Sequence, residues 1–205
     1  MTPKVIQAPI AEPISIEEAR AHLEAKPYED SDVDPIDDVM IEGWLAAARE
    51  HCENFLGLSL STRVLEVALD EFPLSTSLDG LPIDLPMGPV REIQSISWGE
   101  GSDDELDADA FVLDNYRLPA RVRPVATAWP VVVPATNLVR IRYLAGYGVD
   151  SDGGEPMPKA IRAAILLILG HLFRNREDST ELAMISIPNG AEALMRPLRV
   201  RLGMA

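Results

Sequence analysis

Apolar residues near the N-terminus recur at steps of three or four, which predicts a short amphipathic helix from Ile16 to about Lys26. Ser15 and Glu18 have the spacing of a capping box at the start of this helix, and a proline ends it. The preceding residues 1–14 contain prolines and little periodic pattern. We therefore expect them to form an extended N-terminal arm.

A second amphipathic helix is predicted from Asp34 to about Leu56. Asp34 is a favourable N-cap, Pro35 is a favourable first helical residue, and Gly57 supplies a C-cap. The residues expected to form the buried stripe of this helix are Ile36, Met40, Trp44, Ala47, His51 and Phe55.

The middle of the chain changes to the two-residue period of β-strands. Alternation is clearest at residues 65–70 and 138–145, where apolar residues alternate with charged ones. Further short strands are predicted at residues 82–85, 90–98 and 111–113, separated by turns rich in Pro, Gly and acidic residues. Such connections favour a small antiparallel sheet or sandwich over parallel βαβ units.

Helical periodicity returns after Pro158. One apolar stripe consists of Ile161, Ile165, Ile168 and Leu172, and three neighbouring leucines broaden it. A helix that is apolar on most sides must be buried, either in its own subunit or against a neighbouring one. The apolar run is shorter than the roughly 20 residues that span a bilayer, so we expect no membrane association.

The order of the predicted elements gives an α+β fold class, in which helices at the two ends of the chain pack together and a small antiparallel β-sheet or sandwich is inserted between them. We expect an N-terminal arm at 1–14, a helical domain formed by 15–58 with 156–195, a β insertion at 59–155, and a C-terminal tail at 196–205. A short helix at residues 191–195 leads into that tail.

A net charge of −15, from 33 acidic and 18 basic residues, argues against tight binding to nucleic acid. Proteins that hold DNA obtain most of their affinity by placing Lys and Arg on phosphates. A surface past which DNA moves without sticking is compatible with this charge. The charge also favours solubility.

Candidate catalytic chemistry is sparse. The histidines His22, His51 and His171 have no metal-ligand spacing, and there is no phosphate-binding loop, nucleophile elbow or HExxH motif. The AGYGVD stretch lacks a third glycine and is better interpreted as a turn. The single cysteine, Cys52, is expected to be a core residue. We therefore expect no enzymatic activity, no cofactor and no bound metal.

Two acidic stretches, at residues 29–38 and 100–109, are the next candidates. The first spaces its aspartates like the first ligands of an EF-hand, but Pro35 and Ile41 occupy the positions of the required glycine and glutamate. Solvated loops are the simpler interpretation, the first beside a helix N-terminus that favours acidic residues. The functional alternative is a surface that repels DNA or meets a basic partner. Its residues are Asp30, Asp32, Asp34, Asp103, Asp104 and Glu105.

The C-terminal tail reverses the charge trend, because no acidic residue follows Glu192 while three arginines occur. Alternating cationic and apolar residues in an extended segment could add to a partner's sheet edge or enter a groove. A frayed terminus is the alternative. The candidate docking residues are Arg196, Leu198, Arg199, Val200, Arg201 and Leu202.

Nearly the whole chain resembles the phage gp6-like head–tail connector (adaptor) proteins, in their larger form with a β insertion. The resemblance is carried by the order and spacing of ISIEEARAHL, DDVMIEGWLAAAREHCENFLG, TRVLEVALDEFP and NLVRIRYLAGYG, followed by PMPKAIRAAILLILGHLFRNRE.

The resemblance implies a structural protein of a tailed-phage virion, made in the host cytoplasm and assembled in the neck. It implies a homo-oligomeric ring, a dodecamer, whose helices build the ring and the channel wall. It implies portal protein and a stopper or tail protein as partners, with the C-terminal segment docked on the portal. DNA would pass through the channel during genome packaging and delivery without specific binding.

Three alternatives stay open at this stage. A stopper or tail-completion protein would occupy a lower position in the same neck, although the helical termini favour the adaptor. An acidic regulatory or DNA-mimic protein would bind a basic host factor as a soluble monomer or dimer. A carboxylate-dependent hydrolase would use the clustered aspartates, but no histidine, nucleophile or phosphate loop supports it.

Overall fold

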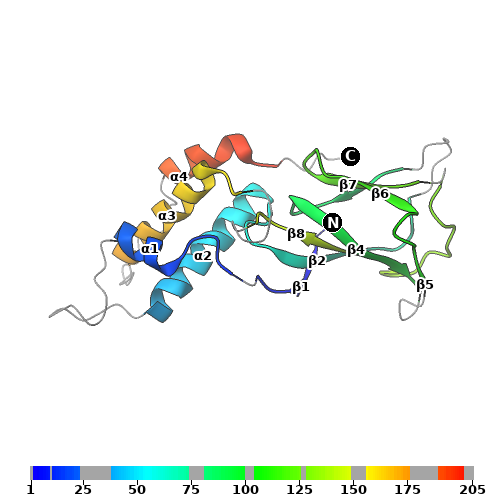
Figure 1. Cartoon of the computed structure of the whole chain (residues 1–205), viewed down its shortest axis with the longest axis horizontal. Coiled ribbons are helices and arrows are strands. Elements are labelled where there is room, and N and C mark those ends of the chain that lie inside the picture. The colour runs from blue at the N-terminus through cyan, green and yellow to red at the C-terminus, as the bar shows by residue number, and fades with distance from the viewer. Residues whose placement is uncertain are drawn as a thin grey trace. The chain divides into compact units, whose positions relative to one another are not determined.

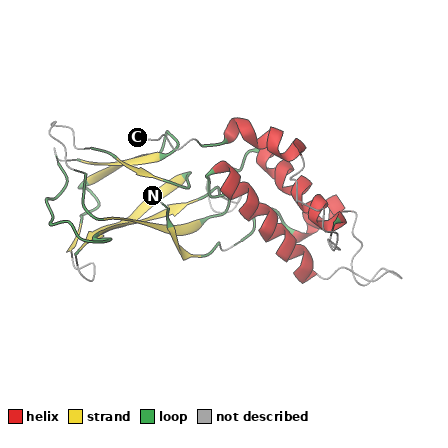
Figure 2. Cartoon of the chain, turned by 180° about the vertical axis from the view of Figure 1, so that it is seen from behind, coloured by secondary structure: helices red, strands yellow, loops and turns green. Residues whose placement is uncertain are grey.

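The computed structural model describes residues 2–9, 11–23, 38–73, 81–99, 104–125, 128–148, 156–175 and 189–200. Within these ranges the chain forms α-helices and two antiparallel sheets (Figures 1 and 2), so the predicted α+β class is confirmed. Contacts divide it into two compact units. The β unit contains residues 1–10, 57–154 and 200–205, and the helical unit contains residues 11–56 and 155–199.

The β unit contains a five-stranded sheet with the order β1-β2-β8-β4-β5 and a three-stranded sheet with the order β3-β7-β6. Every pair of neighbouring strands is antiparallel. The strands are β1 (Lys4–Gln7), β2 (Arg63–Leu69), β3 (Ile83–Leu85), β4 (Val90–Trp98), β5 (Asp104–Glu105), β6 (Phe111–Asp114), β7 (Ala120–Pro124) and β8 (Val139–Ala145).

The predicted alternation places the core of this unit. Strand β8, between β2 and β4, buries every second side chain: Val139, Ile141, Tyr143 and Ala145. On its other face Arg142 donates to Glu66 of β2, with 2.6 Å between Nε and Oε2. The hydroxyl of Tyr143 donates to the Pro86 carbonyl at 2.8 Å, so the buried phenol keeps a hydrogen bond.

An aromatic cluster extends the same core. Phe72 stacks on Trp129 with 5.4 Å between ring centroids, and it meets the edge of Trp98 at 5.7 Å. The indole nitrogen of Trp129 donates to the Leu81 carbonyl at 2.8 Å. Each large side chain is therefore held by a partner of defined geometry, which specifies one packing arrangement.

Three strands were not predicted from the sequence. Strand β1 lies in the expected N-terminal arm, where it pairs with β2 although its residues are exposed. Strand β7 buries only Ala120 and Val122, and the arginines that flank Val122 interrupt the apolar pattern. Such a short pattern is not enough to predict a strand. Strand β5 lies inside the expected acidic loop and pairs with the end of β4.

In the AGYGVD stretch, strand β8 ends at Ala145 and the chain bends at Gly146, whereas Val149 and Asp150 lie outside the described residues. The first glycine of the stretch has a steric role. Gly146 has a φ of +116° and its amide donates to the Pro89 carbonyl. A Cβ at this position would lie 2.2 Å from the Ser61 carbonyl oxygen. The close backbone approach, not phosphate binding, accounts for this glycine.

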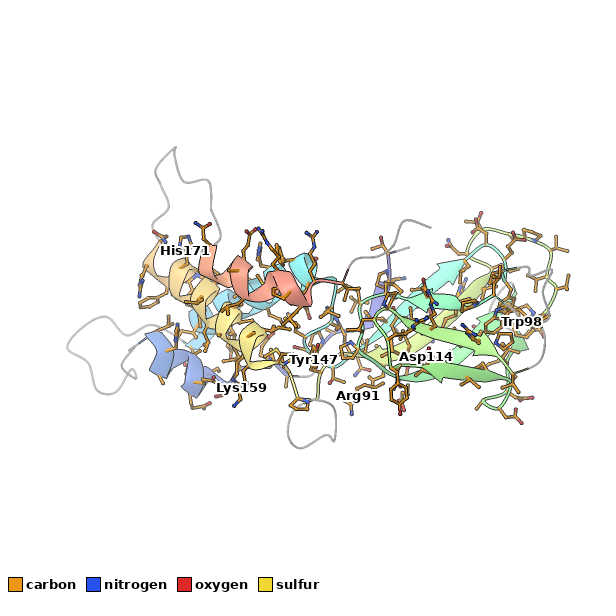
Figure 3. The ribbon with its side chains drawn as sticks, turned by 90° about the horizontal axis from the view of Figure 1, so that it is seen from above. Arg91, Trp98, Asp114, Tyr147, Lys159 and His171 are labelled. Carbon is orange, nitrogen blue, oxygen red and sulfur yellow. The ribbon has the colours of Figure 1, made fainter. Side chains whose placement is uncertain are left out.

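The helical unit contains α1 (Ile16–Leu23), α2 (Asp38–Leu56), α3 (Lys159–Arg174), α4 (Asn189–Met195) and the 3₁₀ turn η2 (Arg196–Leu198). Its hydrophobic interior lies where α3 packs against α2, α1 and α4. Lys159 and His171 mark the two ends of α3 in Figure 3. The predicted cap of α1 is confirmed, because the Glu18 amide donates to Ser15 Oγ at 3.2 Å.

The predicted buried stripe of α2 was wrong by about one residue. Met40 and Ala47 are exposed, and Trp44, His51 and Phe55 are half-buried. The buried residues are Ile41, Leu45, Ala48, Arg49, Cys52, Glu53 and Leu56. Periodicity alone chose the stripe with the larger aromatic residues, because it could not foresee that an arginine and a glutamate would be buried. The predicted start of this helix, at Asp34 and Pro35, lies outside the described residues.

That buried charge forms one network. The Arg49 guanidinium donates to Glu53 at 2.7 Å and to Glu12 at 2.8 Å, and Arg49 and Glu53 are both almost fully buried. Paired charges tolerate burial where a single charge would not. The Glu12 contact fixes the segment before α1 onto α2.

A second ion pair joins the two ends of the chain. Arg162 of α3 donates to Glu18 of α1, with 2.8 Å between Nε and Oε1, and it also donates to the Pro13 carbonyl. The stripe predicted for α3 is correct in that Ile161, Ile165 and Ile168 are buried, whereas its fourth member is half-buried. The terminal helices of the sequence therefore form one hydrophobic layer.

Candidate interaction surfaces

The C-terminal segment begins with a 3₁₀ turn at Arg196–Leu198, before the residues whose alternation suggested an extended segment. Helix α4 is anchored by the buried Ala191 and Met195, and η2 follows directly, with Pro197 in its first turn. The Arg196 side chain is 78% exposed, and its guanidinium lies 3.8 Å from the Glu192 carboxylate. Arg196 therefore presents its charge to solvent close to the end of the helical unit.

The extended conformation starts at Arg199, which has φ −65° and ψ 123°. Its guanidinium carbon lies 5.2 Å from the centre of the Phe55 ring, a cation–π contact with the end of α2. Val200 is half-buried, whereas Leu198 is exposed. Of the six predicted docking residues, the structure describes these three and Arg196, and Arg201 and Leu202 lie outside the described residues. Sequence reasoning missed the contact of Arg199 with its own chain.

The structure describes two of the six residues of the predicted acidic surface. Asp104 and Glu105 form β5, opposite Trp98 and Ser97, and both are exposed. The carboxylates therefore lie on a sheet edge, where charged residues also discourage pairing with another strand. The remaining candidates, Asp30, Asp32, Asp34 and Asp103, lie outside the described residues.

Potentially reactive side chains in the helical unit have surroundings that are typical of structural residues. Cys52 is fully buried, and burial together with the nearby Glu53 charge raises the pKa of its thiol to about 12. His51 is half-buried, and the Asn175 side chain contacts the His171 ring and donates to the His171 carbonyl. Among the described residues, no group of three His, Cys, Asp or Glu side chains could hold a metal ion.

The most exposed apolar residues of the β unit, which sequence reasoning did not single out, lie in two connections. Tyr116, in the β6–β7 hairpin, is 99% exposed. Between β7 and β8, Val131 and Val133 are exposed while Val132 packs on the core. Across the described part of the chain, no helix has both the length and the apolar character needed to cross a membrane.

Three solved structures have the same fold as this chain over its full length. The first comes from the neck of an empty gene transfer agent (GTA) particle computed with C6 symmetry, with a TM-score of 0.75 and 22% identity. The second comes from the virion of a native GTA particle, with a TM-score of 0.74 and 20% identity. The third comes from the neck of a native GTA particle computed with C12 symmetry, with a TM-score of 0.69 and 20% identity.

Each of these matches covers 100% of this chain and 99% of the compared chain. The likeness therefore includes both the β unit and the helical unit. No protein-family profile matches the sequence. No curated protein sequence matches it either. The structural matches establish the fold, since sequence identity of 20–22% leaves function to be argued.

Proposed function

We propose that this chain is a non-enzymatic structural subunit of the neck of a tailed-phage-like particle. It would act as a head–tail connector (adaptor) of the gp6-like kind, assembled from the host cytoplasm into the virion. One observation carries the proposal: the fold matches chains from GTA necks over 100% of this chain, with both units included. A chance likeness in one small unit would not extend to the other.

A ring of identical subunits is the second part of the proposal. Two of the compared necks were computed with C6 and C12 symmetry, which supports a homo-oligomeric ring here and agrees with a dodecamer. Closed cyclic symmetry requires every subunit to make the same contact with each neighbour. Repetition of that contact adds avidity, so each single contact can be weak.

The C-terminal segment is proposed to dock on the portal above the ring. Arg196 and Leu198 are exposed at the end of α4, and Arg199 begins the extended part of the segment. Arg201 and Leu202 continue the alternation of charge and apolar character in the sequence. An exposed cationic and apolar segment suits an acidic groove or a sheet edge of a partner.

The DNA channel is proposed to repel its cargo. The chain carries a net charge of −15, and Asp104 and Glu105 are exposed on a strand edge. Repeated around a ring, such charge produces a negative potential that keeps phosphates from binding. DNA could then pass without specific contacts, and stopper or tail proteins would bind below.

The test is deletion of the gene in a particle-producing host, followed by electron microscopy of the particles. We expect heads that do not carry attached tails, and complementation with the wild-type gene should restore complete particles. Purified complete particles should contain the chain at several copies each. Complete particles formed without it, or purified particles that lack it, would reject the proposal in favour of an acidic regulatory protein. Copies placed below an intact adaptor ring would indicate a stopper.

A further inference from the structure

Helices α2 and α3 each have an outer face that carries exposed residues. The helices pack together through their buried faces, which include Leu45 and Cys52 on α2 and Ile165 on α3. On any helix the outer face is opposite the buried one. Each outer face therefore lies outside the contact between α2 and α3, and α3 also packs against α1 and α4.

The outer face of α2 is apolar and acidic. Val39 is 68% exposed and Met40 49%, and a Cβ added at Gly43 would meet nothing within 4 Å. Ala47 and Glu50, one and two turns further along, are also exposed. We call these five residues the acidic face. The helix has one basic residue apart from His51, an arginine that is buried in the ion-pair network.

The outer face of α3 is apolar and basic. Leu167 is 40% exposed and Ala163 is exposed beside it. Lys159 and Arg174 are exposed at the two ends of the helix. We call these four residues the basic face. Helix α3 contains no acidic residue, so both charged side chains of this face are cationic. Glu50 gives the α2 face its negative charge, and it also lies 3.6 Å from the Arg49 guanidinium.

We propose that the acidic face of one copy packs against the basic face of the next copy, and that this contact closes the ring. The inference rests on the proposed neck function. A head-to-tail ring needs two different, complementary surfaces on each subunit. These two faces fulfil that condition, since apolar residues lie on both and their charges are opposite.

The same charges determine which surface can pack against each face. Two acidic faces brought together, or two basic faces, would place like charges across an apolar contact and repel. A two-fold symmetric dimer through either face is therefore disfavoured. The complementary surface that the described chain itself offers is the opposite face of a second copy.

Cysteine cross-linking in assembled particles tests this contact. The variant Ala47→Cys/Ala163→Cys, expressed in place of the wild type, carries one thiol on each face. Purified particles are treated with a short flexible bis-maleimide, denatured and separated by mass. We expect a ladder of covalent oligomers that ends at the closed ring, because every copy links to both neighbours. Cys52 contributes no background, since it is fully buried.

Matched controls distinguish the proposed head-to-tail contact from a contact between like faces. Ala47→Cys alone and Ala163→Cys alone should remain monomeric. Ala21→Cys/Ala163→Cys, with an exposed alanine of α1 in place of that of α2, should also give no ladder. Dimers from a single-cysteine variant would show a like-to-like contact and overturn the proposal. Monomers alone from particles that contain the double variant would overturn it as well, while the neck function would stand.

Charge reversal keeps the contact testable if the cysteines disturb assembly. Glu50→Lys alone and Arg174→Glu alone should each lower the amount of the chain in purified particles, because each places like charges across the contact. The double variant restores opposite charges and should recover incorporation. Failure of the double variant to exceed both single variants would overturn the proposed pairing, whereas absence of even the wild-type chain would reject the neck function itself.

Discussion

The two units are built around different kinds of core. The β unit buries large aromatic side chains, among them Phe72, Trp129 and Tyr143, within its two sheets. The buried apolar residues described in the helical unit include several alanines and no aromatic residue, and two charged residues, Arg49 and Glu53, are buried with them.

This difference indicates where each unit finds its stability. Large buried aromatic side chains contribute strongly to folding, and they close the β core within the subunit. The helical unit buries smaller side chains, while Val39, Met40 and Leu167 stay exposed on its outer faces. Exposed apolar surface of this kind marks interaction sites. The β unit also exposes apolar residues, among them Tyr116, Val131 and Val133, so both units carry surface that assembly could bury.

The largest expected effect is in the β core. Phe72→Ala should lower the free energy of unfolding by about 4 kcal/mol, because it removes a fully buried ring and leaves a cavity beside Trp129 and Trp98. Urea unfolding followed by far-UV circular dichroism measures it. Tyr116→Ala, at a fully exposed position, is the matched control and should change stability by less than about 0.5 kcal/mol. Equal effects would contradict the described core.

In the helical unit, a substitution that disturbs the buried charges should lower the free energy of unfolding by a comparable amount. Arg49→Met should cost about 3 kcal/mol, because it removes the guanidinium that lies 2.7 Å from the buried Glu53 carboxylate. Arg49→Met/Glu53→Leu removes both charges and should recover most of the loss. The same urea titrations compare the two variants. A double variant no more stable than the single one would contradict an uncompensated Glu53 charge as the cause of the loss.

Loss of the α1 cap should have a smaller effect. Ser15→Ala removes the acceptor of the Glu18 amide and should lower the free energy of unfolding by about 1 kcal/mol. Ser15→Asp keeps an acceptor at the N-cap and should retain wild-type stability. Thermal unfolding of the three proteins distinguishes the cap from a general effect of substitution, which would lower both variants equally.

The smallest stability effect should come from the C-terminal segment. Arg199→Ala removes a cation–π contact and should cost only about 0.5 kcal/mol. If the segment docks on the portal, the same variant should reduce tail attachment far more than stability. Arg199→Lys keeps the charge and is the control. Normal tail attachment in Arg199→Ala particles would remove this residue from the docking surface.

The sequence predicted regular elements well where one side of an element is apolar. The strand β8 and the helix α3 follow their periodicity closely, and β2 and β4 lie where strands were predicted although the register of β4 shifts twice against β8. Strand β1 could not be predicted, because its residues are exposed and its place in the sheet depends on pairing with β2, a contact distant in sequence.

The buried face of α2 shows a different limit. A pattern based on apolar residues assigns Arg49 and Glu53 to solvent, yet their mutual pairing makes burial favourable. Among the candidate site residues, exposure of Arg196, Asp104 and Glu105 followed from their charge. The contact of Arg199 with Phe55 could not be predicted without the fold, because the two residues are far apart in the sequence.

A cryo-EM reconstruction of the particle neck is the most direct test of the proposed ring. We expect a closed ring of this chain between portal and tail. The acidic face of each copy should lie against the basic face of the next, and the C-terminal segment should point toward the portal. A neck in which no density fits both the β unit and the helical unit of this chain would contradict the proposed ring.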